Sequence, residues 1–382
     1  VDTLIEAKRI AKTSIIVDTH IDVPYRLEFT PADISIATDT GDFDYPRAQN
    51  GGLNAPFMSI YTPASLEAEG RSKVIANGLI DIVEEIVDRS PDKFAIALSP
   101  SDVRKQFAAG LISFPLGMEN GSPIEGDLAN LRYFFDRGIR YVTLSHGLSN
   151  HISDSSYDEH RQWNGLSEFG VEVVEEMNRL GIMVDVSHIS DDAFWQVIEL
   201  SRAPVIASHS SARHFTPGFE RNMADDMIKA LAEKGGVIQI NFGSSFITAD
   251  AQAYSKAQGV AREAYAAEHP EISKLDIYRQ FSAIYAAEHG KIPYATTEDV
   301  LNHIDHVVAL TSIDHVGIGS DFDGVGDSLP IGLKDVSAYP NLIKGLLDRG
   351  YSVEDIQKIL GENLLRVWQA VEDYAATTSS NT

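Results

Sequence analysis

Short apolar runs alternate with amphipathic segments along most of the chain. Eight runs rich in Val, Ile and Leu predict strands, at residues 14–18, 94–98, 111–118, 140–145, 182–187, 204–208, 237–241 and 315–320. Because these runs are continuously apolar, they are typical of strands buried on both faces of a parallel sheet. The segments between them have helical periodicity at residues 128–137, 166–180, 191–201 and 225–234. Eight such repeats predict a (β/α)8 TIM barrel and favour it over an open doubly wound sheet.

Two segments are longer than an ordinary connection in such a barrel. Residues 26–64, with clusters of Pro, Gly and Asp, predict an insertion after strand 1. Residues 250–312, rich in Ala and Glu, predict a helical insertion after strand 7. After the last strand, residues 337–350 and 352–373 predict two amphipathic helices, and the tail from 375 to 382 is expected to fray. No low-complexity linker divides the chain, so a single domain is expected over its whole length.

Composition excludes several classes of protein. The 382 residues include 31 Lys and Arg against 56 Asp and Glu, and the net charge of −25 argues against nucleic acid or an anionic membrane surface as partner. The chain has no cysteine, which excludes disulfides, thiolate metal sites and a cysteine nucleophile. No run of about 18 apolar residues occurs, so no transmembrane segment is expected.

Polar residues follow the predicted strands at the end where the active sites of such barrels lie. The residues in this position are His20, Asp22, Ser99, Glu119, His146, His188, His209, Asn241, Asp321 and Asp323. Imidazole and carboxylate groups that suit a transition metal are supplied by His20, Asp22, Glu119, His188, His209 and Asp321. These ligands are too many for one catalytic zinc ion, which normally takes about three from the protein. They predict two metal ions, Zn²⁺ or else Mn, Co or Fe, bridged by Glu119 and holding a hydroxide between them.

Other motifs are weaker. A single histidine after a strand is usually structural, and only the whole constellation of ligands is specific. His303 and His306, three residues apart on a predicted helix before the last strand, are interpreted as structural. The sequence has no glycine-rich phosphate loop and no G-x-S-x-G elbow, so neither a nucleotide site nor a serine nucleophile is expected.

Seven motifs, in their order and spacing, resemble the membrane (renal) dipeptidase family of the amidohydrolase superfamily: VDTHID, GMENG, YVTLSH, VDVSH, SHSSAR, RNMADD and HVGIGSDFDG. The resemblance covers nearly the whole chain. It implies a (β/α)8 barrel with two Zn²⁺ ions that hydrolyses dipeptides, including those with a D residue at the C-terminal side. It also implies that one ion is bound by His20, Asp22 and Asp321 and the other by His188 and His209, with Glu119 bridging.

The resemblance implies further roles in catalysis. His146 is expected to contact the carbonyl oxygen that becomes the oxyanion, and Arg221 to bind the free α-carboxylate of the substrate. We expect Asp321 to take the proton of the attacking hydroxide and deliver it to the leaving amine. Asp22, or backbone near it, is expected to hold the free amine of the dipeptide.

The sequence departs from the mammalian members of this family. Having no cysteines and no hydrophobic C-terminal anchor signal, it resembles a bacterial member, for which neither disulfide-linked dimers nor a GPI anchor is expected. The bacterial cytoplasm, or the periplasm after removal of a signal peptide, is the predicted location, and a homodimer is plausible. Two rival functions are hydrolysis of N-acyl amino acids or β-lactams at the same centre, and a metal-containing barrel kept only for binding.

Overall fold

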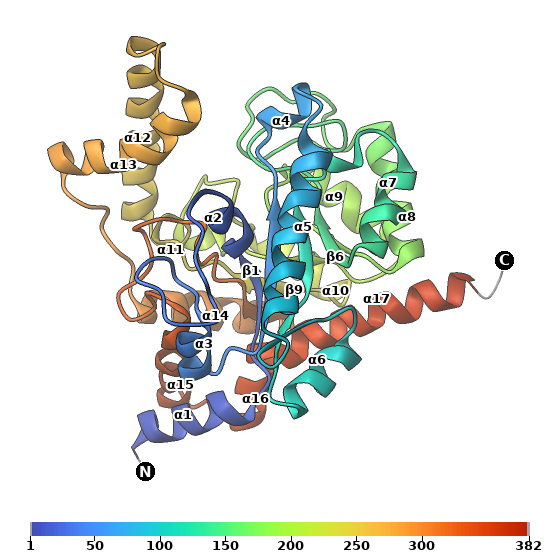
Figure 1. Ribbon diagram of the computed structural model, residues 1–382, viewed down its shortest axis with the longest axis vertical. Helices are drawn as coiled ribbons and strands as arrows, with labels where there is room; N and C mark the ends of the chain where they lie inside the picture. The colour runs from blue at the N-terminus through green and yellow to red at the C-terminus, as the bar shows by residue number, and fades with distance from the viewer. Residues whose placement is uncertain (1, 380–382) are drawn as a thin grey trace.

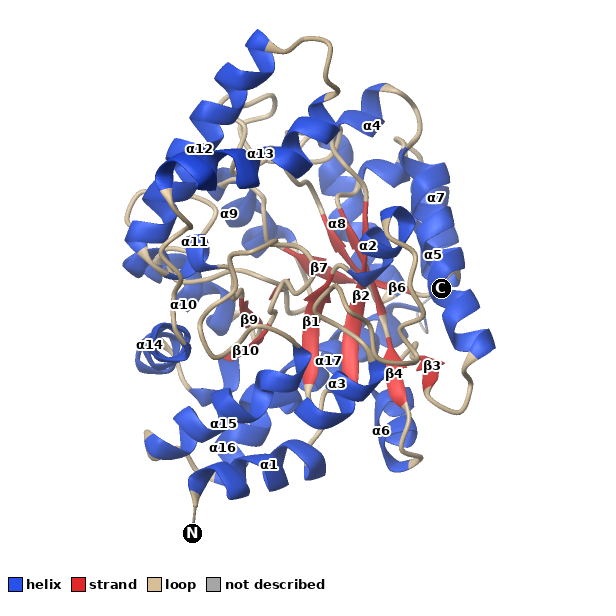
Figure 2. Ribbon diagram, turned by 60° about the vertical axis from the view of Figure 1, so that its left-hand side comes forward, coloured by secondary structure: helices blue, strands red, loops and turns tan. Residues whose placement is uncertain are grey.

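The computed structural model describes residues 2–379, and at its centre is a closed barrel of eight parallel strands (Figures 1 and 2). Around the barrel the strands follow the order β1, β10, β9, β8, β7, β6, β5, β2. Their bounds are Val17–Ile21 (β1), Ala55–Tyr61 (β2), Leu116–Glu119 (β5), Ile139–Thr143 (β6), Met183–Asp185 (β7), Ile206–Ala207 (β8), Val237–Ile240 (β9) and Val316–Ile318 (β10). The predicted (β/α)8 barrel is confirmed.

One predicted strand is not part of the barrel. The run at 94–98 forms β3 (Phe94–Ile96), which pairs with β4 (Ile112–Phe114) in a separate two-stranded sheet. Only Phe94 in β3 is fully buried, whereas the two residues after it are partly exposed, so the strand lacks the cover on both faces that a barrel strand has. The other seven predicted runs each overlap a barrel strand, although the run at 14–18 includes only the first two residues of β1.

The second barrel strand is β2, which lies inside the segment predicted to be an insertion. The prediction for 26–64 is therefore wrong at its C-terminal end, where residues from Ala55 onward pair with β1 and β5. Pro56 interrupts the apolar run of β2 in the sequence, and a proline argues against a central strand because it cannot donate a ladder hydrogen bond. Pro115 likewise separates β4 from β5 within the run predicted at 111–118.

Helices surround the barrel. They are α1 (Thr3–Thr13), α2 (Val23–Phe29), α3 (Tyr45–Gly51), α4 (Ser65–Ala68), α5 (Ser72–Arg89), α6 (Pro100–Ala108), α7 (Leu128–Asp136), α8 (Glu168–Leu180), α9 (Asp191–Leu200), α10 (Asp225–Glu233), α11 (Ser244–Ile247), α12 (Ala249–Glu268), α13 (Lys274–His289), α14 (Thr297–Leu310), α15 (Tyr339–Asp348), α16 (Val353–Gln357) and α17 (Asn363–Ser379). The four helices predicted between residues 128 and 234 are confirmed as α7 to α10.

Helix α8 shows how the sequence sets these boundaries. The Ser167 hydroxyl accepts a hydrogen bond from the Gly170 N–H and caps the first turn. The helix ends at Gly181, whose φ of 88° lies in the left-handed region that glycine adopts without strain. Between these ends, Val173, Val174 and Met177 are buried on one face of the helix. This apolar face packs against the barrel.

Helix α17 closes the N-terminal end of the barrel (Figure 1). Its Trp368 is fully buried, and the ring centroid lies 5.3 Å from that of Phe57 in β2. Phe57 in turn stacks on Tyr141 of β6 with centroids 5.5 Å apart. Because aromatic side chains fill this end, the open end for chemistry is the one at which the strands terminate.

Helices α12 and α13 form an insertion between β9 and β10, as predicted, and project beyond the barrel (Figure 1). The segment predicted at 250–312 also includes α14, but this helix packs against both β9 and β10 and is part of the barrel wall. The insertion is therefore shorter than predicted. Its α13 buries Ile277 and Phe281, so the two helices are anchored by an apolar contact of their own.

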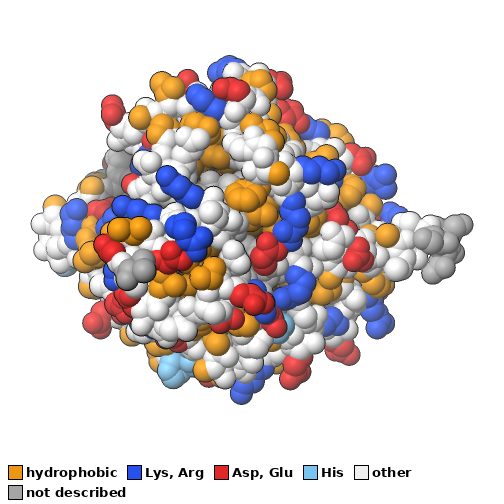
Figure 3. Space-filling view, turned by 90° about the horizontal axis from the view of Figure 1, so that it is seen from below, with side chains coloured by type: hydrophobic (Ala, Val, Ile, Leu, Met, Phe, Trp, Pro, Cys, Tyr) orange, Lys and Arg blue, Asp and Glu red, His pale blue; other side chains and the backbone are white. Residues whose placement is uncertain are grey.

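The chain remains helical further toward its C-terminus than predicted. Residues 375–379 belong to α17, with Ala375 buried, and residues 380–382 lie outside the described part of the chain. Among the helices of residues 2–379, none has the length and apolar character needed to span a bilayer. Acidic and basic side chains lie interspersed on the face that Figure 3 shows. The compartment and the homodimer stay predictions.

Candidate active site

The six predicted metal ligands come from five barrel strands and meet at one end of the barrel. His20 lies near the end of β1, Asp22 directly after it, and Glu119 is the last residue of β5. His188, His209 and Asp321 follow β7, β8 and β10. All six side chains are buried, and their ligand atoms fall into groups whose members lie within 4.8 Å of one another. The barrel register thus brings together the residues that the sequence pattern selected.

Glu119 lies at the centre of this cluster, and its two oxygens face different groups. The Oε2 atom lies 3.2 Å from Nε2 of His20. The Oε1 atom lies 3.1 Å from Nε2 of His188 and 3.2 Å from Nε2 of His209. A carboxylate with one oxygen toward each of two ligand groups has the arrangement of a bridging ligand.

Two aspartates complete the group around His20. Oδ2 of Asp22 lies 3.2 Å from Nε2 of His20, and Oδ1 of Asp321 lies 3.7 Å from the same nitrogen. Burial opposes a charged His20, but Tyr141 and the carboxylates of Glu119 and Asp22 raise the pKa of this imidazole well above its usual value. The electrostatic field at this position therefore favours a positive charge among the carboxylates.

The protonation of the other histidines suits a metal cation. Burial lowers the pKa of His209 to about 3 and that of His188 well below its usual value, so both rings are neutral at pH 7. Their Nε2 atoms lie only 2.9 Å apart, and Nε2 of His20 is buried without a hydrogen-bond partner. Neutral imidazole nitrogens converging beside carboxylates fit a divalent transition metal, which would satisfy all of them at once.

Neighbouring residues fix the tautomers of two of these histidines. The Tyr141 hydroxyl donates to the Thr19 carbonyl at 2.9 Å, so it accepts from Nδ1 of His20 at 2.9 Å. The Ser208 hydroxyl donates to the buried Asp185 carboxylate and accepts from Nδ1 of His209 at 2.8 Å. Since each Nδ1 carries a proton, each ring turns its Nε2 atom to the cluster, and a metal ion bound there would hold that nitrogen in its unprotonated form.

The backbone is specialised where it supports the cluster. A Cβ atom on Gly117 would lie 1.9 Å from the Tyr141 ring, and one on Gly324 would lie about 2 Å from the carboxylates of Asp321 and Asp22, so only glycine fits at both positions. His188 and Asp321 have φ values of 72° and 65°, in the left-handed region. Such strain in residues with side chains is concentrated at functional sites.

His146 and Arg221, the other two predicted site residues, lie beside the cluster. Nε2 of His146 is 3.4 Å from Oε1 of Glu119, and burial lowers the pKa of this imidazole. The Arg221 guanidinium is buried, donates to the Ser210 hydroxyl at 2.9 Å and to the His209 carbonyl at 2.6 Å, and has an Nε without a partner. Among residues 2–379 it has no carboxylate partner, so its charge is available to an anionic ligand.

The remaining strand-end residues differ in their surroundings. Asn241 donates to Oδ2 of Asp321 at 2.9 Å and so orients that carboxylate. Asp323 faces away from the cluster: its carboxylate pairs with Arg26 and accepts from the Asp42 N–H. Ser99 caps α6, outside the barrel, because the predicted strand before it is not a barrel strand.

Aromatic side chains lie around the cluster, and none of them is among the site residues predicted from the sequence. The Tyr61 ring lies 4.7 Å from that of His146 and 4.9 Å from that of Tyr25. The Tyr157 ring lies 5.9 Å from that of His188, and Phe246 lies beneath the Arg221 guanidinium. These four aromatic residues, Tyr25, Tyr61, Tyr157 and Phe246, are called the aromatic wall below. They come from four separate segments with no shared spacing, so only the folded chain shows that they lie near one another.

The insertion adds one more aromatic residue to this wall. Burial of the Tyr278 hydroxyl, in α13, raises its pKa, and the negative charges of Asp321 and Glu119 raise this pKa further. Burial is the main cause that raises the pKa of Tyr25, Tyr61 and Tyr157, and the nearby Tyr278 hydroxyl adds a smaller increase to each. Its side chain is nevertheless 62% exposed, and the Arg262 guanidinium lies over one part of the ring, 4.8 Å from its centroid.

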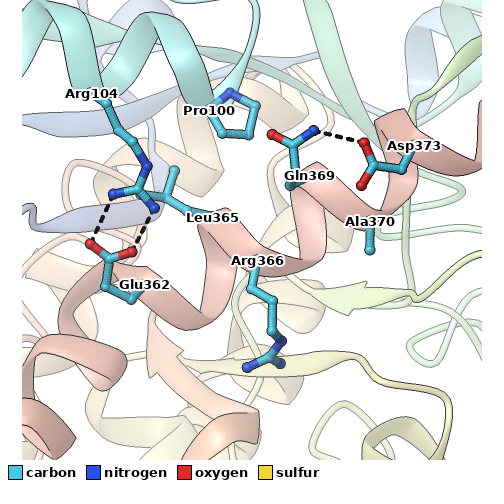
Figure 4. A pocket seen from close by; sticks show the side chains of 8 residues that line it. All are labelled: Pro100, Arg104, Glu362, Leu365, Arg366, Gln369, Ala370 and Asp373. Atoms are coloured by element: carbon cyan, nitrogen blue, oxygen red, sulfur yellow. Dashed lines mark hydrogen bonds and ion pairs between the residues drawn. The ribbon is translucent and has the colours of Figure 1, made fainter. Parts of the chain in front are cut away.

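A surface groove lies at the opposite end of the barrel, between α6 and α17 (Figure 4). Arg104 forms a two-point ion pair with Glu362 there, and Gln369 donates to Asp373. Arg366 donates to the Asp314 carbonyl. Because these polar groups already have partners within the chain, the groove offers no counterpart to the cluster at the strand ends.

Known proteins match this chain over nearly its full length. The model of the family described as membrane dipeptidase (peptidase family M19) matches residues 4–382. An uncharacterized dipeptidase of Schizosaccharomyces pombe is 32% identical over 374 residues, which cover 94% of this chain and 81% of the relative.

Two solved structures share the fold. The probable dipeptidase PvdM of Pseudomonas aeruginosa is 28% identical with a TM-score of 0.85, over 98% of this chain and 99% of that one. A metallo peptidase of Rhodobacter sphaeroides, liganded with a phosphinate mimic of the dipeptide L-Ala-D-Ala, is 26% identical with a TM-score of 0.76, over 94% of this chain and 99% of that one.

Proposed function

The chain belongs to the membrane dipeptidase family, peptidase family M19, and is thus a metal-dependent dipeptidase; we propose that it uses two Zn²⁺ ions and cleaves both L,L and L,D dipeptides. The observation that carries the proposal is the position of Glu119, with one oxygen toward His20 and the other toward His188 and His209. The dipeptide mimic bound to the Rhodobacter relative contains a D residue, which supports the wider stereochemistry.

We assign the ligands in two sets. His20, Asp22 and Asp321 would hold one ion and His188 and His209 the other, and Glu119 lies where it could serve both. The neutral Nε2 atoms and the buried carboxylates supply a donor set that suits Zn²⁺. When bound, a pair of zinc ions polarises a carbonyl group and lowers the pKa of a shared water toward about 7.

Arg221 binds the C-terminal carboxylate of the dipeptide. Its guanidinium is buried beside the cluster and has no acidic partner among the described residues, so a substrate carboxylate would supply the missing counter-charge. A longer peptide would carry an uncharged amide at this distance from the scissile bond. The position of Arg221 therefore restricts the enzyme to substrates with one residue after the bond that is cut.

His146 and Asp321 act on the reacting atoms. His146 is neutral because burial lowers the pKa of its ring, so it can donate an N–H hydrogen bond to the carbonyl oxygen as negative charge develops there. Asp321, held by Asn241, accepts the proton of the attacking water and transfers it to the leaving amine. Asp22 is positioned to contact the free amino group of the substrate.

Metal analysis tests the two-ion centre. Protein purified with excess zinc is expected to hold about two metal ions per chain in this centre, and chelation should abolish dipeptide hydrolysis until zinc is restored. Glu119→Gln should lower the metal content below that of the wild type, because the bridging charge is lost. Glu125→Gln, in the turn that follows β5, serves as a matched control and should retain both metal and activity. Well under one ion per chain in the wild type would contradict the centre.

A panel of substrates separates dipeptidase activity from its nearest alternatives. Metal-loaded protein is incubated with L,L and L,D dipeptides, N-acyl amino acids and β-lactams, and release of amino acids or ring opening is measured. The proposal expects the highest kcat/KM for dipeptides. Faster turnover of N-acyl amino acids, which share the carboxylate but lack the free amine, would instead assign the enzyme to acyl amino acid hydrolysis.

Tyr278 is expected to contribute to substrate binding. Tyr278→Ala should raise KM for dipeptides with large apolar side chains by about 5- to 30-fold, because an aromatic contact of about 1–2 kcal/mol is lost. The value of kcat should change little, since the ring does not touch the metal ligands. Steady-state kinetics with Leu-containing and Gly-containing dipeptides measure the effect.

The matched control for this variant is Val260→Ala, on α12 of the same insertion, where the side chain is 64% exposed. It should leave KM within about twofold of the wild type, as expected for a surface substitution. An equal rise of KM in both variants would mean that the insertion acts through its stability and not through the Tyr278 ring.

A further inference from the structure

A second group of metal-ligating side chains lies outside the active-site cluster. His214 belongs to the short 3-10 helix η2 (Arg213–Phe215), Asp225 is the first residue of α10, and His306 lies in α14. One potential ligand atom from each of these residues lies within 4.8 Å of the others. Three separate segments thus converge on two imidazoles and one carboxylate.

The contacts within this group resemble those of the active-site cluster. Nε2 of His306 lies 2.8 Å from Oδ1 of Asp225, and the His214 ring stacks on the His306 ring with centroids 4.4 Å apart and planes 20° from parallel. A single ion pair with Asp225 explains only the His306 ring. Within residues 2–379 no hydrogen bond holds His214, so the second imidazole has no polar partner that accounts for its position.

The neighbouring His303 shows what a structural histidine looks like in the same helix. Its ring is fully buried, Nδ1 accepts from the Ala212 N–H at 3.0 Å, and Nε2 donates to the Ile247 carbonyl at 2.9 Å. Both nitrogens are used, which agrees with the structural role predicted for it. His306 was predicted to be structural as well, but it faces a second histidine and an aspartate and is part of the cluster.

We propose that His214, Asp225 and His306 form a third metal site, which binds a divalent transition-metal ion such as Zn²⁺. Two imidazole nitrogens and a carboxylate oxygen are the donor set that Zn²⁺ takes in three-ligand protein sites, with the fourth position left to water. The side chains of His306 and Asp225 are 17% and 43% exposed, so an ion can reach the site from solvent. This proposal does not depend on the function of the active-site centre.

A metal at this site would join two parts of the barrel wall. His214 and Asp225 flank the loop that carries Arg221, and His306 belongs to the helix that packs on β9 and β10. The base of the loop is already closed by two hydrogen bonds: the Arg213 N–H donates to the Met223 carbonyl, and the Met223 N–H donates to the Ser211 carbonyl. The ion would add a link from this base to α14, and it would stabilise the folded state according to its affinity and concentration.

The test compares metal content in matched variants of the whole chain. Wild type, His214→Ala and His306→Gln are loaded with Zn²⁺, dialysed against a series of fixed free zinc concentrations, and analysed for metal per chain. The control is His269→Ala, because His269 also pairs with a carboxylate, that of Glu271 at 3.1 Å, but within residues 2–379 it belongs to no group of three potential ligands. We expect the wild type and the control to bind about one ion more than either site variant.

Two further readouts decide between this site and the active-site centre. Glu119→Gln should lose metal from the active-site centre yet retain the ion whose binding depends on His214. Added Zn²⁺ should raise the Tm of Glu119→Gln more than that of the double variant with His214→Ala. Equal metal content in the wild type and both site variants would overturn the proposal and leave His306 and Asp225 as a simple side-chain pair. The proposal would also be overturned if His269→Ala lost as much metal as the two site variants.

Discussion

Asp321→Asn is expected to lower kcat by about three orders of magnitude or more while leaving most of the bound metal in place. The reason lies in the orientation of the neighbouring amide. Asn241 accepts from the Gly243 N–H at 2.8 Å through its oxygen, so its NH₂ group must face Oδ2 of Asp321. The substituted amide therefore turns its own oxygen to Asn241 and its NH₂ to the centre, where it cannot accept a proton. His20, Asp22 and Glu119 remain to hold the ion.

Single-turnover and steady-state rates, measured beside metal content, check this expectation. Asp323→Asn is the matched control, since Asp323 follows β10 on the same turn but bonds to Arg26 and the Asp42 backbone. It should keep kcat within a few-fold of the wild type, because its carboxylate does not face the cluster. Near-wild-type turnover by Asp321→Asn would remove its role in proton transfer, and loss of all metal would show that it acts as a ligand alone.

The convergence of the six proposed metal ligands could be predicted because it follows from local rules. A buried parallel strand is recognised by its own residues, and in a barrel every strand ends at the same face. His188 and His209 each follow a continuously apolar run, which places them side by side once β7 and β8 pair. To predict each proposed ligand it was therefore enough to locate the C-terminal end of its own strand. No contact between distant parts of the chain had to be known.

Strands β2 and β3 show where local rules fail, because the sequence pattern predicted β3 as a barrel strand and missed β2. Residues 94–98 form a continuous apolar run, whereas Pro56 interrupts the run in Ala55–Tyr61 and argues against a central strand. What decides between them is pairing: Met58 to Tyr61 align with Leu116 to Glu119, whereas β3 reaches only β4. Pairing partners are a property of the folded chain. The order of the ligands was unaffected, because β5 remains the third barrel strand.

The residues that contact the proposed ligands could not be predicted from the sequence, because their contacts also depend on how distant segments pack. Tyr141 reaches His20 across 121 positions of the chain, and no spacing rule connects them. Tyr278 lies on an insertion whose helices have weak amphipathic character, so its approach to Tyr61 and Tyr157 depends on how that insertion docks. His214 and His306 likewise meet only after α14 packs beside α10.

Arg221→Met is expected to lower kcat/KM for dipeptides by about 100- to 1,000-fold, while hydrolysis of the matching dipeptide amides changes only a few-fold. The methionine stem can still cover Phe246, beneath the lost guanidinium, so the cavity left behind is small. What is lost is the charge that pairs with the substrate carboxylate, and an amide substrate has no such carboxylate. The ratio of kcat/KM between each dipeptide and its amide isolates this effect from any change in folding.

Arg221 also makes two hydrogen bonds within the chain, to the Ser210 hydroxyl and to the carbonyl of His209, which is a proposed metal ligand. Ser210→Ala removes one of them and keeps the guanidinium, so it should lower kcat/KM by a similar small factor on both substrate types. The Tm of each variant monitors the structural part of the change. If Arg221→Met impaired dipeptides and amides equally, the residue would act by holding the backbone at His209, and recognition of the carboxylate would have to come from another group.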